Sequence, residues 1–214
     1  MDGRKSKGFT LTELLVVLMV VAIFLSIGVP AFNELVATNR VATSVNDLVS
    51  SMHLARSEAV KRKTNATICA STDWNTAKPT CDPIGKISDG WIVFADCTEL
   101  PPAQGGNCGA PNLIVEEFDT VVSIHGPLPD SIAESFTVWP MGKEYVSFGA
   151  NGFSTESSGQ RIPKTDVQLC DSGNAVDTDG TAAGPSAQVT DTGRAQVYGN
   201  NGDVRNASNP LNGC

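Results

Sequence analysis

A mostly apolar stretch covers residues 9–32 near the amino terminus. Residues 14–32 are 19 positions without a charge, enough for a helix to cross a hydrocarbon core of about 30 Å. The first eight residues, MDGRKSKG, carry three basic side chains, so we expect this end to stay in the cytoplasm and the rest to be exported. Because no small-residue cleavage site follows the apolar run, the segment differs from a signal peptide and should be retained.

The pattern then becomes amphipathic. Apolar residues recur every three or four positions, as on one stripe of a helix, at Val41, Val45, Leu48, Met52, Ala55 and Ala59. This predicts one helix over about residues 9–62, roughly 80 Å long at ~1.5 Å per residue. Only its first part fits in a membrane, so the stripe of the second half must pack on a folded domain. Lys61, Arg62 and Lys63 lie at its end, where cations suit the helix dipole.

Pro30 lies inside this predicted helix, close to Gly28. Because proline lacks an amide hydrogen and clashes with the preceding turn, we expect a kink or local melting at Pro30. Two interpretations stay open: a flexible joint used during assembly, or an ordinary proline tolerated in a membrane helix.

Short β-type runs replace the helical pattern after Thr64. They cover residues 66–70, 91–95, 113–118, 120–125, 136–139, 144–148, 166–169 and 194–198. Asn151-Gly152 separates two of the runs and indicates a hairpin. The predicted fold class is therefore α+β, with a long amino-terminal helix packed on an antiparallel, β-sandwich-like carboxy-terminal domain.

Composition narrows the classes of function. The 214 residues include 15 Lys and Arg against 23 Asp and Glu, a formal charge of −8, which excludes a basic, nucleic-acid-coating protein. Six cysteines form no C-x-x-C pair, and this favours disulfides over a zinc or redox site and places the domain outside the cytosol.

Six cysteines allow 15 connectivities, among which the sequence cannot choose. Proximity along the chain suggests Cys69 with Cys81 and Cys97 with Cys108, which leaves Cys170 with Cys214 to hold the carboxyl tail. Each bridge would add ~2–4 kcal/mol to the stability of a domain with few aromatic residues.

Glu13 is an acid at the edge of the membrane segment. A carboxylate at the centre of a bilayer costs about 2.5 kcal/mol or more, so such a residue is a functional candidate that needs a partner. The alternative is that Glu13 lies close enough to the interface to reach water.

The segment Gly8-Phe9-Thr10-Leu11-Thr12-Glu13-Leu14-Leu15 resembles the processing site of type IV prepilins and type II secretion pseudopilins. The resemblance implies cleavage after Gly8 by a membrane peptidase and methylation of the new amino group on Phe9. It also implies that Glu13 pairs with the amino terminus of a neighbouring subunit's Phe9 during assembly. The chain then divides into a leader (1–8), a membrane and assembly helix (9–32), an amphipathic half-helix (33–63) and a β-rich globular domain (64–214).

Further motifs resemble the GspH/FimT group of minor pilins and pseudopilins. These are residues 54–62 (LARSEAVKR), Ile68-Cys69, residues 90–94 (GWIVF) and Thr192-Gly193-Arg194. The resemblance implies a minor pilin of a type IV pilus, incorporated near the filament tip to prime assembly. Its partners would be other major and minor pilins, the prepilin peptidase and the inner-membrane assembly platform. The subunit would be a single-pass inner-membrane protein with a periplasmic carboxy-terminal domain, and after assembly it would lie in a surface pilus.

Two alternatives remain. One is the H-type pseudopilin of type II secretion, which takes part in protein secretion. The other is DNA capture, because some relatives carry a Gly-Arg-x-Arg element that Gly193-Arg194-Ala195-Gln196 resembles. Here Gln196 replaces the second arginine, which should weaken phosphate binding. Loss of the leader also makes the formal charge −10, so DNA contact by Arg194 is the weakest of the three hypotheses.

The sequence predicts no enzyme, cofactor or metal site. His53 and His125 have no neighbouring cysteine or acid that suggests a triad, and no G-x-S-x-G or H-E-x-x-H motif occurs. Residues 171–187 are rich in Gly, Ala and Asp but lack the full ligand spacing of a calcium loop, so we interpret them as a turn-rich loop.

Overall fold

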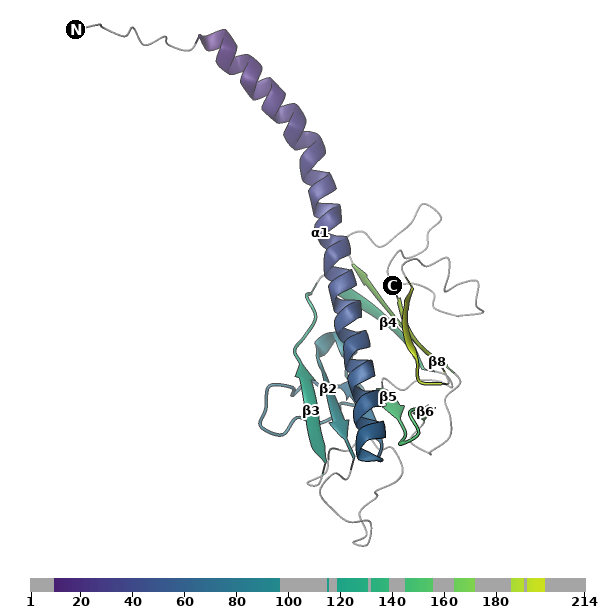
Figure 1. The fold of residues 1–214 in the computed structure, drawn as a ribbon. Coiled ribbons are helices and arrows are strands. Elements are labelled where there is room, and N and C mark those ends of the chain that lie inside the picture. Colours follow the sequence, from purple (N-terminus) through teal and green to yellow (C-terminus); the bar gives the residue numbers. More distant parts are fainter. Residues whose placement is uncertain are drawn as a thin grey trace, which may run out of the picture.

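The computed structural model describes residues 10–96, 115, 119–130, 132–138, 145–155, 164–171, 186–190 and 192–198. A single long helix, α1 (Leu11–Arg62), extends from a β-rich domain (Figure 1). The elements that follow are β1 (Ala66–Ala70), the 3-10 helix η1 (Ile87–Asp89), β2 (Trp91–Ala95), β3 (Thr120–His125), β4 (Ile132–Val138), β5 (Tyr145–Phe148), β6 (Ser154–Thr155), β7 (Lys164–Asp171), β8 (Ser186–Thr190) and β9 (Ala195–Tyr198).

Local signals define both ends of α1. Thr10 is the N-cap, and its hydroxyl oxygen accepts a hydrogen bond from the backbone N–H of Glu13 at 3.3 Å. At the other end Lys63 adopts a left-handed conformation and donates its backbone N–H to the Ala59 carbonyl. The helix is unbroken through Pro30, and its axis curves between the amino end and the domain (Figure 1).

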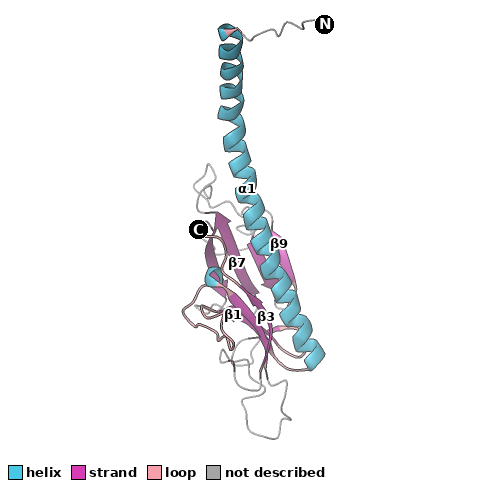
Figure 2. Cartoon of the chain, turned by 90° about the vertical axis from the view of Figure 1, so that its left-hand side faces the viewer, coloured by secondary structure: helices cyan, strands magenta, loops and turns pink. Residues whose placement is uncertain are grey.

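The strands form two antiparallel sheets beside the helix (Figure 2). The five-stranded sheet has the order β3-β2-β1-β5-β6, and the four-stranded sheet has the order β4-β7-β8-β9. All of the strand pairs are antiparallel. The predicted α+β class, a long helix on an antiparallel β domain, is confirmed.

The strands match the sequence pattern unevenly. The hairpin at Asn151-Gly152 is present, with β5 paired to β6 and Gly152 at a φ of +76°. The prediction of a loop over residues 171–187 was wrong at both of its ends. Residues 186 and 187 belong to β8, and residue 171 belongs to β7. Ala187, Gln188 and Val189 are all buried, and a run this short with a polar residue at its centre does not stand out from the Gly- and Ala-rich sequence before it. Of the run 113–118, only Val115 lies within the described residues.

The core lies where α1 meets both sheets. All six residues of the amphipathic stripe are at most 3% exposed, and they pack with Trp91, Phe148, Leu169 and Val189 from the two sheets. A second cluster, Cys69, Ile92, Phe94 and Tyr145, covers the other face of the five-stranded sheet. Because β1 and β2 are buried on both faces, their sequences read as continuous apolar runs rather than alternating ones.

Candidate assembly site

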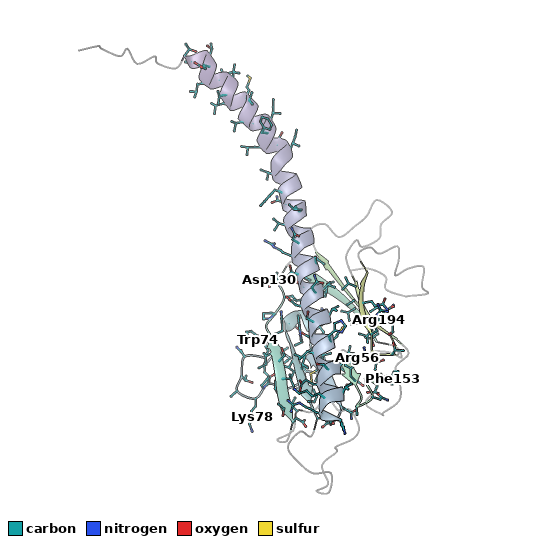
Figure 3. All side chains as sticks on the ribbon, in the orientation of Figure 1. Arg56, Trp74, Lys78, Asp130, Phe153 and Arg194 are labelled. Atoms are coloured by element: carbon teal, nitrogen blue, oxygen red, sulfur yellow. A yellow bond between two sulfur atoms is a disulfide. The ribbon has the colours of Figure 1, made fainter. Side chains whose placement is uncertain are left out.

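The first half of α1 is exposed on all sides. The segment Leu11–Val29 has a mean hydropathy of 2.6, and none of it is buried against the domain. Figure 3 shows its side chains projecting around the whole helix. At ~1.5 Å per residue this segment is about 28 Å long, close to the thickness of a hydrocarbon core. An apolar surface of this extent needs lipid or other helices around it.

Glu13 lies in the first turn of this segment. A carboxylate is favourable there because the helix dipole places partial positive charge at the amino end. Among the residues that the structure describes, none forms an ion pair with Glu13. Gly8 and Phe9, the predicted cleavage and methylation positions, lie outside the described residues. The predicted roles of Glu13 and Pro30 stay predictions.

The basic end of α1 is partly neutralised within the helix. Glu58 is 7% exposed and accepts hydrogen bonds from Arg62 at 2.5 Å and from Lys61 at 3.2 Å. The Arg62 guanidinium is the main reason that the pKa of the Glu58 carboxyl lies below its ordinary value; burial opposes this effect and Lys61 adds to it. The ion pairs of Glu58 with Lys61 and Arg62 therefore stabilise the last turns of α1. The same cations lie where the sequence led us to expect them, at the negative end of the helix dipole.

The disulfide Cys69–Cys81 is present, with a Cα–Cα distance of 5.6 Å. It joins β1 to the connection that leads to β2, and it supports the first of the three pairings expected from proximity. Cys97, Cys108 and Cys214 lie outside the described residues, and Cys170 is placed only as a backbone position in β7.

Asp73 organises the loop that this disulfide closes. Its carboxylate accepts hydrogen bonds from the Thr80 backbone N–H at 2.8 Å, the Ser71 hydroxyl at 2.9 Å and the Thr80 hydroxyl at 3.0 Å. Burial is the strongest single influence on the Asp73 pKa and raises it, but the hydrogen bonds together outweigh burial, so the pKa lies below its ordinary value of 3.8. The ionised form therefore stabilises the loop.

We predict that Asp73→Asn opens this loop at neutral pH. The stability that the ionised carboxylate supplies is present above the pKa of the unfolded chain, about 3.9, and is lost as pH falls through the lower pKa of the folded state. Loss of charged hydrogen bonds worth about 1.5 kcal/mol should make the Thr80 amide exchange ~10-fold faster at pH 7. Hydrogen exchange measured from pH 7 to pH 3 should show falling Thr80 protection, corrected for intrinsic rates, in the parent only. Equal protection in the variant and the parent would contradict the role of Asp73, and Asp130→Asn, at an exposed acid, is the control.

His125 has an acidic neighbour that the sequence did not reveal. Its Nε2 lies 3.7 Å from a carboxylate oxygen of Asp47 on α1, and its ring stacks on Trp91 with centroids 3.7 Å apart. Its Nδ1 lies 2.7 Å from the Gly126 carbonyl oxygen, so Nδ1 carries the proton. This places Asp47 of α1 beside β3 of the five-stranded sheet, whereas the stacking on Trp91 and the Gly126 contact lie within the domain itself. His53 is exposed on α1.

Arg194 is exposed in the turn between β8 and β9. Its backbone carbonyl accepts from the Thr190 N–H at 3.0 Å, which closes the turn. The structure brings this turn next to Arg56 of α1, whose guanidinium donates to the Thr192 carbonyl at 3.0 Å. Nothing in the local sequence pattern had singled out Arg56 as a residue with a role of its own. The sequence signal that could have indicated this contact is that residues 54–62 and 192–194 both belong to motifs of the GspH/FimT group. Arg56 and Thr192 are 136 positions apart, so no local pattern joins them.

The exposed apolar helix, the acid in its first turn and the antiparallel domain define a helix-anchored subunit of the type IV pilin class. A model of the prokaryotic N-terminal methylation motif matches residues 3–29. The family model described as Type II transport protein GspH matches residues 44–184, about two thirds of the chain. The chain belongs to this GspH family of pilins and pseudopilins, whose members are structural proteins. The apolar helix and the methylation motif fit anchoring in the inner membrane.

Solved structures of minor pilins and pseudopilins are similar to the chain. The type IV minor pilin FimU of Pseudomonas aeruginosa PAO1 is 16% identical, with 75% of this chain and 89% of that chain covered and a TM-score of 0.44. The minor pseudopilin EpsH from the type 2 secretion system of Vibrio cholerae is 9% identical, with 74% and 96% covered and a TM-score of 0.40. No curated protein sequence matches the chain.

Proposed function

We propose that this protein is a minor subunit of a type IV pilus, placed at or near the filament tip to prime assembly. The observation that carries the proposal is the segment Leu11–Val29, which is strongly apolar apart from Glu13 and has no residue buried by its own domain. Such a helix can lie in the inner membrane before assembly and pack against the helices of other subunits afterwards.

The chemistry of assembly centres on Glu13. Cleavage after Gly8 frees the amino group of Phe9, which remains positive when methylated. Placed in hydrocarbon, that cation and a Glu13 carboxylate would each be costly alone, so pairing between neighbouring subunits offsets both costs. Because the contact joins different surfaces of two subunits, it can repeat head to tail, and where the rotation between subunits does not close it builds an open helical filament. The partners in this proposal are major and minor pilins, the prepilin peptidase and the assembly platform.

A second candidate is the H-type pseudopilin of type II secretion. The family that the chain matches, Type II transport protein GspH, favours it. The same helix and the same Glu13 pairing would then serve protein export. DNA capture through Arg194 has weaker support, because the next arginine expected in the element is Gln196 and the chain without its leader carries a formal charge of −10.

Deletion of the gene in its host separates these candidates. Loss of twitching motility and of surface pili, with normal release of secreted enzymes, is the expected result. Loss of enzyme release with normal twitching would overturn the pilus assignment and support the pseudopilin. Loss of DNA uptake alone would support DNA capture. Complementation with the parent gene should restore the phenotype, whereas the Glu13→Ala gene should not.

A further inference from the structure

Arg56 joins three parts of the molecule that lie far apart in the sequence. From α1, its Nε–H donates to the Gly152 carbonyl at 3.0 Å and an Nη2–H donates to the Thr192 carbonyl at 3.0 Å. Gly152 lies in the turn between β5 and β6 of the five-stranded sheet, and Thr192 lies in the turn between β8 and β9 of the four-stranded sheet. One side chain therefore fastens both sheets to the helix.

The two turns also contact each other directly, and we name this region, residues 149–155 and 192–194 with Arg56, the hairpin corner. Gly193 has a φ of +73°, and a Cβ added to it would run into the carbonyl oxygen of Gly152. The Ser154 hydroxyl donates to the Thr190 carbonyl at 3.2 Å, from one sheet to the other. The close approach of two backbones explains why glycine stands at position 193.

A guanidinium is suited to this position. It presents several N–H donors in a fixed planar fork, so two carbonyls in different directions can be satisfied at once. A lysine ammonium on a flexible stem is a point charge and does not reproduce that fork. Arg56 also follows Ala55, one of the stripe residues buried against the sheets, so the helix packing fixes where the fork points. Figure 3 shows Arg56, Arg194 and Phe153 close together on this side of the domain.

The four-stranded sheet has a specific need for such a fastener. The two sheets have separate hydrogen-bond ladders, and the strand of the five-stranded sheet at this edge, β6, has only two residues. Short elements with few ladder hydrogen bonds open at low free energy. Buried Ala187, Val189 and Ala195 pack the β8–β9 hairpin on the core with α1, but these side chains are small, so loss of the Arg56 hydrogen bond could let the turn of the hairpin separate from α1 while the five-stranded sheet stays folded.

We propose that Arg56 is a latch that closes the hairpin corner on α1, so that the helix and both sheets move as one body. The inference does not depend on which machine uses the subunit. Its consequence is that the surface around Arg194 is held in a fixed orientation relative to the helix that the filament packs. A subunit with an open latch would keep its membrane helix and its five-stranded sheet but present a mobile hairpin corner.

The test is hydrogen exchange with mass spectrometry on the full chain in detergent micelles. In Arg56→Gln, amides in residues 149–155 and 192–198 should exchange ~10-fold faster or more, while β1 and β2 keep the parent rates. Arg40→Gln, which removes an exposed arginine from the same helix, is the matched control and should leave the corner unchanged. Unchanged exchange at the corner in Arg56→Gln would overturn the latch. So would a uniform rise over all strands, or failure to fold, because either shows a global rather than a local role.

Two further variants probe the latch by independent routes. Arg56→Lys keeps the charge but not the fork, so it should also open the corner; full parent protection in this variant would overturn the two-carbonyl mechanism. Gly193→Ala keeps the arginine, but its Cβ would run into the Gly152 carbonyl oxygen that Arg56 binds and lie 3.3 Å from the Arg56 Nε, so it should force the two turns apart, and we expect the same local pattern of faster exchange. Parent-like exchange in Gly193→Ala would show that the turns do not depend on the close contact and would count against the latch.

Discussion

Glu13→Ala protein is expected to enter the membrane and lose its leader normally, yet to be missing from purified filaments. The variant leaves the apolar helix intact, so insertion and processing do not suffer. It removes the acid that the proposed mechanism pairs with the amino group of a neighbouring Phe9. Breaking a buried pair by removing one partner costs about 3–5 kcal/mol, which corresponds to a loss of ~100-fold or more in incorporation.

The measurement is immunoblotting of membranes and of sheared filaments from the same cells. Ser26→Ala is a suitable control, because the Ser26 hydroxyl donates to the Ile23 carbonyl of its own helix at 2.8 Å and so has a partner that needs no second subunit. The control should enter filaments at the parent level. If Glu13→Ala protein reaches the filaments as well as the control does, the pairing mechanism is wrong.

Trp91→Ala should cause the largest loss of folding stability, about 3–5 kcal/mol. Trp91 is 1% exposed, its indole N–H donates to the Ser51 hydroxyl at 3.0 Å, and its ring stacks on His125. Truncation would leave a cavity between α1 and the five-stranded sheet, remove the hydrogen bond to Ser51 of α1, and remove the ring stacking that joins β2 to β3. The effect should appear as a lower midpoint of thermal or denaturant unfolding of the full chain in detergent.

Ile84→Ala is the control for this experiment. Ile84 is 90% exposed, so its truncation should change the free energy of unfolding by less than about 0.5 kcal/mol. A Trp91→Ala protein whose midpoint matches that of the control would mean that the core around Trp91 does not support the fold.

The elements with strong periodicity were predictable from the sequence. The helix ends at Arg62, as its apolar stripe and final cations indicated, and β1, β2 and β3 have the predicted bounds. Weak patterns failed for a physical reason. In β8 the buried apolar positions among the described side chains are Ala187 and Val189, with Gln188 also buried between them, and in β4 the strand begins at Ile132, four residues before the predicted run. Both strands pair with β7, and this pairing stabilises their extended conformation. Because the paired segments lie far apart in the sequence, a local hydrophobic pattern does not reveal the pairing.

The amino-acid sequence alone predicted a membrane helix with an acid at its start, because 19 positions without a charge after a basic segment depend only on local order along the chain. It also indicated the family, since each motif that carries the resemblance is a short continuous segment. Only the tertiary structure decided that Arg56 meets the turns at Gly152 and Thr192 and that Asp47 lies beside His125. Those contacts arise when two sheets dock on one helix, and the geometry of docking is a property of the packed molecule that no local segment encodes.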